Sequence, residues 1–140
     1  MGDLREVLPH TGSLIRRAQQ RHVAEWNRLV SKTITSVQFA ALAVLAHQPE
    51  ASQRELGDAL EMDRSTIADL AARLERHGLV ERTQDPADKR RYILRLTALG
   101  KNELERLRPL ADEVEQALTR SLQASELKQL HTLLYALLKG

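Results

Sequence analysis

The chain has no cysteine among its 140 residues. This absence excludes disulfide bonds, thiol catalysis, cysteine-based redox sensing and zinc sites built from cysteine. The sequence also lacks any run of about 18 apolar residues, the length that a membrane-spanning helix needs. Because the N-terminus has no apolar signal-peptide core either, we expect a cytoplasmic protein with no membrane partner.

Aromatic side chains are scarce, with only Trp26, Phe39, Tyr92 and Tyr135 in the whole chain. Single-stranded nucleic acids are bound by stacking bases on aromatic side chains, so that mode is disfavoured. The five histidines are scattered without metal-binding spacing. No glycine-rich phosphate loop or nucleophile elbow occurs. We therefore expect no metal site, no cofactor and no enzymatic activity.

The positive charge of the chain is concentrated in one region. Residues 64–95 carry eight arginines and lysines against five aspartates and glutamates, a net charge of +3, whereas the whole chain carries +2. A polyanionic partner would therefore meet a local basic surface and not a generally basic protein.

Capping residues and apolar spacing predict the element order. Thr35 with Gln38, and Ser52 with Glu55, form capping-box patterns. The expected elements are a helix over 10–31, a helix from Thr35 to Pro49, a short helix capped by Ser52, a helix from its N-cap Asp63 to the C′ residue Gly78, strands over 79–83 and 92–96, a long helix over 98–121 capped by Thr97 and bent at Pro109, and a last helix capped by Ser125.

The short helix capped by Ser52 and the helix that follows its N-cap Asp63 are joined by a tight turn at 60–63. Together they form a helix-turn-helix pattern. Gly57 in the first of the two indicates close approach of a neighbouring helix. Arg64 at the start of the second suits guanine, while Ser65 and Thr66 suit bases or phosphates. Arg73, near the same face, suits a phosphate. Taken alone, these residues also fit an ordinary solvated helix face.

The hairpin that follows favours DNA contacts over an ordinary solvated helix face. Its turn, Asp85–Asp88, leads to three consecutive cations, Lys89, Arg90 and Arg91, which we expect at the tip. A helix-turn-helix followed by a basic hairpin is a winged helix, whose tip enters the minor groove of DNA or binds its phosphates. The sequence therefore favours double-stranded DNA as the partner.

The stretch DPADKRRYILRLTALG resembles the wing motif of the MarR family of bacterial transcriptional regulators, D-x-R-x-x-x-L-x-L-T-x-x-G. Six positions meet this pattern: Asp88, Arg90, Leu94, Leu96, Thr97 and Gly100. The stretches LERHGLVERTQDPAD and TSVQFAALAVLAHQP are similar to the exit of that family's recognition helix and to its second helix. The chain length and element order agree too, so the resemblance covers nearly all 140 residues.

The resemblance implies a mainly α fold with a small β-hairpin, in one domain over 1–140. Residues 35–97 would form the winged helix-turn-helix lobe, and 10–31 and 98–140 the dimerisation helices. It further implies a homodimeric, nucleoid-associated regulator, most often a repressor, on a pseudo-palindromic operator. Arg90 would enter the minor groove and Asp88 would orient it, although Asp88 also fits a simple Asx-turn. The expected DNA-binding residues are Ser52, Arg54, Arg64, Ser65, Thr66, Arg73, Asp88, Lys89, Arg90 and Arg91.

Many members of that family bind a small aromatic or phenolic acid between the dimerisation helices and the DNA-binding lobe. Arg16, His22 and Trp26 on the first helix are the candidates for such a site. Trp26 also fits the core of a dimer, and the leucine-rich C-terminal helix also fits packing within a monomer. Two other functions stay open from the residues: a winged-helix protein-interaction module, and a small-molecule-binding protein without DNA binding.

Overall fold

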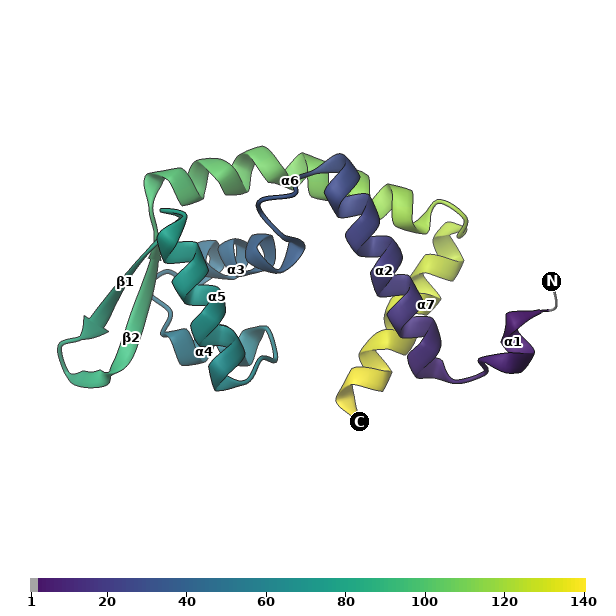
Figure 1. The fold of residues 1–140 in the computed structure, drawn as a ribbon, viewed down its shortest axis with the longest axis horizontal. Helices are drawn as coiled ribbons and strands as arrows, with labels where there is room; N and C mark the ends of the chain where they lie inside the picture. Colours follow the sequence, from purple (N-terminus) through teal and green to yellow (C-terminus); the bar gives the residue numbers. More distant parts are fainter. Residues whose placement is uncertain (1–2) are drawn as a thin grey trace. The chain divides into compact units, whose positions relative to one another are not determined.

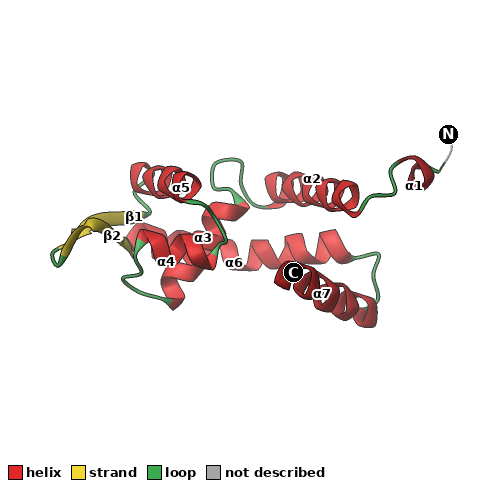
Figure 2. Cartoon of the chain, turned by 90° about the horizontal axis from the view of Figure 1, so that it is seen from below, coloured by secondary structure: helices red, strands yellow, loops and turns green. Residues whose placement is uncertain are grey.

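The computed structural model describes residues 3–140 and is mainly helical, with a β-hairpin (Figure 1, Figure 2). The elements are α1 (Leu4–Val7), α2 (Thr11–Leu29), α3 (Ser36–His47), α4 (Gln53–Ala59), α5 (Arg64–Arg76), β1 (Val80–Asp85), β2 (Asp88–Leu96), α6 (Ala98–Thr119) and α7 (Ala124–Lys139). The predicted fold class is confirmed. The single turn α1 was not predicted, because four residues are too few to show a helical period.

The capping boxes that the sequence predicts are present. Thr35 Oγ1 accepts the Gln38 backbone N–H at 3.1 Å, and Gln38 Oε1 accepts the Thr35 N–H at 3.1 Å. Ser52 Oγ accepts the Glu55 N–H at 3.0 Å, and Glu55 Oε1 accepts the Ser52 N–H at 3.4 Å. These bonds satisfy N–H groups that have no partner within the helix, so residues three apart determine where α3 and α4 begin.

The predicted start of the last helix is wrong by two residues. Ser125 lies inside the first turn of α7, and the N-cap is Gln123. Glu126 Oε1 reaches back to accept the Gln123 N–H at 2.8 Å, which closes the turn earlier than a serine cap at 125 would. Glutamine is an unusual N-cap residue, so composition favoured the serine.

The hairpin is longer and its turn tighter than predicted. β1 and β2 are antiparallel and pair from Val80 with Leu96 to Asp85 with Asp88, which leaves only Pro86 and Ala87 in the turn. The three cations, 89–91, therefore belong to strand β2 and not to the turn. The register is irregular here, because Gln84 pairs with Tyr92 and Asp85 with Asp88, so residues 89–91 form a bulge of β2 that lies opposite no residue of β1.

The chain divides into two compact units. The central unit is Ser31–Leu110, and the terminal unit joins the described residues up to Val30 with Ala111–Gly140. The boundary falls inside α6, whereas the sequence places the end of the DNA-binding lobe before that helix. Pro109 lies within α6 near this boundary; the bend expected there stays a prediction.

The core of the central unit explains Gly57. Leu42, Leu56, Leu74 and Leu94 are fully buried where α3, α4, α5 and the hairpin pack on one another. A Cβ on Gly57 would lie 3.3 Å from Ile67 Cγ2 of α5. The close approach of α4 and α5, expected from a glycine inside a short helix, is confirmed, and it sets the geometry of the helix-turn-helix.

The start of α6 is fastened to the end of α5 by a short motif. Thr97 Oγ1 donates to the Gly78 carbonyl at 2.6 Å and accepts the Gly100 N–H at 3.0 Å. The Thr97 N–H bonds the Leu79 carbonyl at 3.1 Å. Gly78 has a φ of 72°, the left-handed conformation expected of a C′ glycine. Thr97 therefore caps α6, as predicted, and also closes the base of the hairpin.

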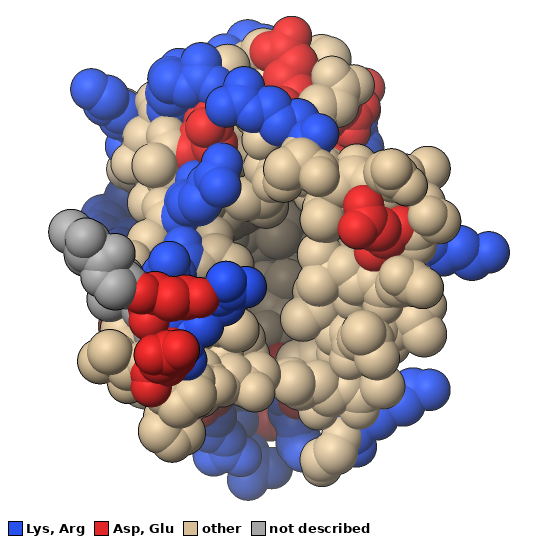
Figure 3. Space-filling view, turned by 90° about the vertical axis from the view of Figure 1, so that its right-hand side faces the viewer, with Lys and Arg blue, Asp and Glu red and all other residues tan. Residues whose placement is uncertain are grey.

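The terminal unit leaves apolar surface exposed. None of the α7 residues is buried in the chain alone. Leu130, Leu133, Leu134, Leu137 and Leu138, which recur at helical spacing, are 39–67% exposed. Figure 3 views the side on which Figure 1 draws α1, α2 and α7, and uncharged side chains cover much of it. A continuous apolar stripe of this kind marks a protein interface.

Candidate nucleic-acid interface

The first turn of α5 presents polar side chains to solvent. Ile67, Leu70, Ala71 and Leu74 bury one face of the helix. The rest of the helix exposes seven polar residues, and four of them are predicted DNA contacts: Arg64, Ser65, Thr66 and Arg73. An amphipathic helix that buries one side and exposes arginines and hydroxyls on the other can lie in a major groove.

Asp63 fixes this first turn. Its Oδ1 accepts the Thr66 N–H at 2.8 Å and the Ser65 hydroxyl at 3.1 Å. These hydrogen bonds, that of the Thr66 backbone above all, lower the pKa of the Asp63 carboxyl. The cap is therefore present above the carboxyl's usual pKa and is lost only as the pH falls through the lowered value. At neutral pH the cap is therefore present and α5 begins at Arg64, so the backbone of Arg64 is held in a defined position.

A groove of about 930 Å³ lies within the central unit, between α4, the start of α5 and the start of β2. It brings together six of the ten predicted DNA-binding residues: Ser52, Arg54, Arg64, Asp88, Arg90 and Arg91. Ser65, Thr66, Arg73 and Lys89 are exposed but are not part of its lining. The groove therefore joins the recognition helix to the wing, as a winged helix that binds DNA requires.

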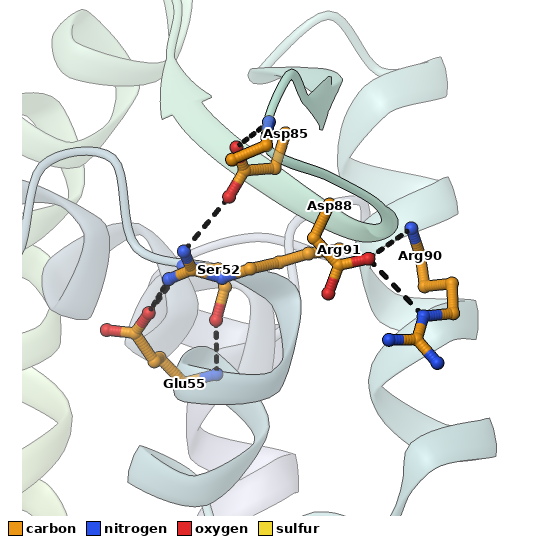
Figure 4. A network of polar contacts seen from close by, with 7 residues as sticks. Ser52, Glu55, Asp85, Asp88, Arg90 and Arg91 are labelled. Carbon is orange, nitrogen blue, oxygen red and sulfur yellow. Dashed lines mark hydrogen bonds and ion pairs between the residues drawn. The ribbon is translucent and has the colours of Figure 1, made fainter.

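The Arg90 side chain is 93% exposed. Among the wing cations that form ion pairs, it is the most exposed. Asp88 Oδ1 accepts both the Arg90 backbone N–H, at 3.0 Å, and the guanidinium Nε, at 3.3 Å. Asp88 thus forms an Asx-turn and also orients the Arg90 side chain, so the two interpretations of this residue hold together. The remaining guanidinium N–H groups stay available to a ligand (Figure 4).

Two of the predicted DNA-binding residues are engaged within the protein instead. Ser52 is only 2% exposed, its hydroxyl caps α4, and its backbone forms a bridge with Ile93 of β2. Arg91 pairs with Glu55 of α4 and with Asp85 of β1, the latter at 3.1 Å (Figure 4). Hydrogen bonds from Ser52 and then from Arg91 lower the pKa of Glu55, which therefore stays ionised at neutral pH.

The partners of Arg91, unlike the capping partner of Ser52, could not be predicted from the sequence. In the sequence, Glu55 shows only a capping pattern. No short-range feature links it to an arginine 36 positions later. Tyr92 lines the groove, and the Arg82 guanidinium lies 4.0 Å from its ring centroid. Gln53 and Asp58 also line the groove, and one signal was available for them: Gln53 is adjacent to Arg54, and Asp58 lies one helical turn after Arg54 on α4.

The three candidate ligand-binding residues all lie on α2. The rings of His22 and Trp26 are 6.4 Å apart at their centroids, tilted by 59°, and Trp26 is 4% exposed. Arg16 lies in a shallow surface hollow of about 490 Å³ whose apolar wall includes Ile15 and Val23. His22 and Trp26 do not line this hollow, so α2 presents the cation and the aromatic pair at separate places.

Metal-binding clusters and membrane-spanning helices are both absent from the part of the chain that the structure describes. Residues 3–140 contain no group of three or more histidine, aspartate or glutamate side chains that could hold a metal ion. None of the helices in that range combines the length and the apolar character that crossing a bilayer requires.

Known proteins resemble the chain over nearly its whole length. The MarR family model matches residues 34–92, from the end of the loop before α3 to the middle of β2. The transcriptional repressor NicR of Pseudomonas putida is 34% identical over 122 residues, covering 86% of this chain and 77% of that protein.

Two solved structures are similar in fold. The regulator PcaV of Streptomyces coelicolor, in complex with its natural ligand, is 37% identical with a TM-score of 0.91, covering 100% of this chain and 97% of that chain. The regulator BpsR of Bordetella bronchiseptica, whose DNA binding is regulated by 6-hydroxynicotinic acid, is 28% identical with a TM-score of 0.88, covering 100% and 99%.

Proposed function

The chain belongs to the MarR family of bacterial winged helix-turn-helix transcriptional regulators, and from this we propose how it acts: as a homodimeric repressor that binds a pseudo-palindromic operator and is released by a small aromatic acid. It is a DNA-binding regulator, and the relatives named above are regulators and not enzymes. Its place of action is then the cytoplasm, on the nucleoid. Family membership favours DNA binding over a protein-interaction module or a small-molecule carrier.

The observation that carries this function is the groove shared by α4, α5 and β2. Arg54, Arg64 and Arg90 line it from three different elements. Arginines that converge on one groove, with exposed hydroxyls beside them, suit a duplex whose bases and phosphates lie at different depths. We assign direct DNA contacts to Arg54, Arg64, Ser65, Thr66, Arg73, Lys89 and Arg90, with Asp88 as the residue that orients Arg90.

Dimerisation supplies the second half-site. The exposed leucine stripe of α7 is the surface to be covered by a second copy. A two-fold dimer presents two recognition helices about 34 Å apart, one turn of DNA, and so fits a pseudo-palindrome. The terminal helices are thus the dimerisation segments, and residues 35–97 carry DNA recognition.

Salt dependence tests the function as a whole. Purified protein is titrated onto DNA from upstream of its own gene and onto unrelated DNA, between about 50 and 200 mM salt. We expect a sequence-preferring complex whose affinity falls steeply with salt, because each phosphate contact releases about one counterion. A complex without sequence preference or without salt sensitivity would remove the case for operator binding.

Arg64→Ala tests the recognition helix. We expect a loss of about 1–3 kcal/mol per half-site and relaxed specificity at one base position, because a bidentate arginine contact discriminates against the wrong base. The measurement is fluorescence anisotropy on the operator and on variants of each base pair. Arg76→Ala, an exposed arginine in the last turn of the same helix, is the control and should leave specificity unchanged. Equal weakening on every sequence would mean that Arg64 contacts only phosphate.

The proposed effector is an aromatic carboxylic acid, by analogy with the acid that regulates BpsR. The Arg16 guanidinium beside apolar side chains can bind a carboxylate, and the single tryptophan, Trp26, lies on the same helix and provides the fluorescence signal. Titrating 6-hydroxynicotinic acid and related aromatic acids should change Trp26 fluorescence and weaken operator binding. Arg16→Ala should weaken acid binding roughly 10-fold or more, since it removes a hydrogen bond to a charged group. Arg17→Ala is the control, and no response across a broad panel would count against the effector.

A further inference from the structure

The wing is connected to α4 at two levels. At its base, the Leu94 N–H donates to the Ala51 carbonyl at 2.9 Å, and the backbone of Ser52 bridges to Ile93. Farther out, the Arg91 guanidinium pairs with Glu55 of α4 and with Asp85 of β1, at 3.1 Å from the latter. A hairpin held only at its base can swing about it, and of the two outer ion pairs only Arg91–Glu55 joins the hairpin to α4, because Asp85 belongs to the hairpin itself.

The α4 end of this connection is itself held in place. Glu55 belongs to the capping box of α4, in which its carboxylate accepts the Ser52 N–H and its N–H bonds the Ser52 hydroxyl. Ser52 is 2% exposed and so cannot move without disturbing the core. The Glu55 carboxylate is therefore a positioned acceptor, and Arg91 reaches it from the wing, as Figure 4 shows.

Charge and direction separate Arg91 from its neighbour Arg90. One positive charge on Arg91 meets two carboxylates, so these three side chains together add no attraction for a polyanion. Figure 4 shows the two side chains running in different directions, Arg90 beside Asp88 and Arg91 toward Glu55. Lys89 has no carboxylate within ion-pair distance among the described residues.

We propose that Arg91 is a positioning residue for DNA binding, and that the acidic residue Glu55 promotes binding by holding the wing at a fixed angle to the recognition helix. This rests on the DNA-binding function proposed above. It replaces the sequence-based interpretation of Arg91 as a phosphate contact. Lys89 and Arg90 are then the cations of 89–91 that meet DNA.

The most discriminating test is whether Glu55→Gln tightens or weakens operator binding. Removing a negative charge beside a DNA-binding groove should tighten binding if long-range electrostatics alone matters. If Glu55 holds the wing, the same change weakens binding, although glutamine keeps an oxygen that can cap Ser52. Asp58→Asn is the matched control: Asp58 is an exposed acid on the same helix, lines the groove, and has no ion pair among the described residues. We expect Asp58→Asn to tighten binding.

The salt slope separates positioning from contact. Arg91→Gln and Glu55→Gln should each raise the dissociation constant about 3- to 10-fold, because each removes the Arg91–Glu55 ion pair from both protomers of the dimer. The slope of log affinity against log salt should stay unchanged. Lys89→Gln should lower that slope by about one for each phosphate that residue 89 no longer neutralises. The double variant Glu55→Gln/Arg91→Gln should bind about as weakly as either single variant, because the two side chains form one interaction.

Two results would overturn the proposal: operator binding by Glu55→Gln as tight as, or tighter than, that of the unchanged protein, or a fall in the salt slope of Arg91→Gln that matches Lys89→Gln. Thermal unfolding of each variant confirms that it folds. Salt-sensitive binding of the unchanged protein, with a reduced slope in Lys89→Gln, establishes DNA binding separately, so a failure of this inference is distinguishable from a failure of the proposed function.

Discussion

Leu137→Asp is expected to separate the dimer and to lower affinity for the full operator about 100-fold or more, since two linked binding sites gain at least this factor over one. Leu137 is 50% exposed in the chain alone, so the substitution removes little packing within the protomer. In a dimer that covers the leucine stripe, the aspartate would bury an unpaired charge. Aspartate at position 137 is thus tolerated in the monomer and excluded from the dimer interface.

Sedimentation equilibrium and fluorescence anisotropy on full and half operators measure this effect. Thr132→Asp is the matched control, because Thr132 is exposed on the opposite side of α7 by helical geometry. It should remain dimeric and bind the full operator normally. A Leu137→Asp protein that is still dimeric would show that the interface lies elsewhere than on the leucine stripe.

Gly100→Ala is expected to destabilise the fold by about 3 kcal/mol, in the upper range for overpacking a rigid site. A Cβ at this position would lie 2.1 Å from the Leu79 carbonyl oxygen and 3.1 Å from its carbon, both backbone atoms. Relief of that overlap requires the start of α6 to move away from the end of α5. Such a move would stretch the bonds that Thr97 makes to Gly78 and Leu79.

Thermal or denaturant unfolding of Gly100→Ala checks this prediction. Gly12→Ala is the control, because a Cβ on Gly12, in the first turn of α2, meets nothing within 4 Å. Alanine also favours helices over glycine, so the control should be neutral or slightly stabilised. Equal stability of Gly100→Ala and the unchanged protein would mean that α6 shifts at little cost, and would remove this explanation for the glycine in the wing motif.

The caps show how much short-range sequence information decides. Thr35, Ser52, Asp63 and Thr97 each cap the helix that the sequence assigned to them. Each cap is a bond between residues three positions apart, so its residues can be recognised from the sequence without knowledge of the fold. The misplaced cap of α7 follows from the same rule, because Glu126 reached Gln123 where serine at 125 was the better candidate by type.

The wing cations show where short-range information ends. Residues 89–91 are three adjacent basic residues, and sequence alone gives no reason to treat Arg91 differently from Lys89. The extension of β2 to Asp88 places them in a strand, in the irregular stretch between Asp88 and Tyr92, and there Arg90 pairs with Asp88 whereas Arg91 pairs with Glu55 and Asp85. Only the folding of α4 against the hairpin brings Glu55 to Arg91.

By itself, the sequence determined the order of the main elements, their capping residues, the winged helix-turn-helix class and the family, because these depend on local hydrogen bonds and on the spacing of apolar residues. The tertiary structure alone decided which of the candidate polar side chains are buried or paired within the protein. Ser52 and Arg91 have the right chemistry for a phosphate, but packing buries Ser52 and brings Arg91 to the Glu55 carboxylate of α4. Burial and ion pairing between distant residues leave no trace in residue type or spacing, and so only the folded chain reveals them.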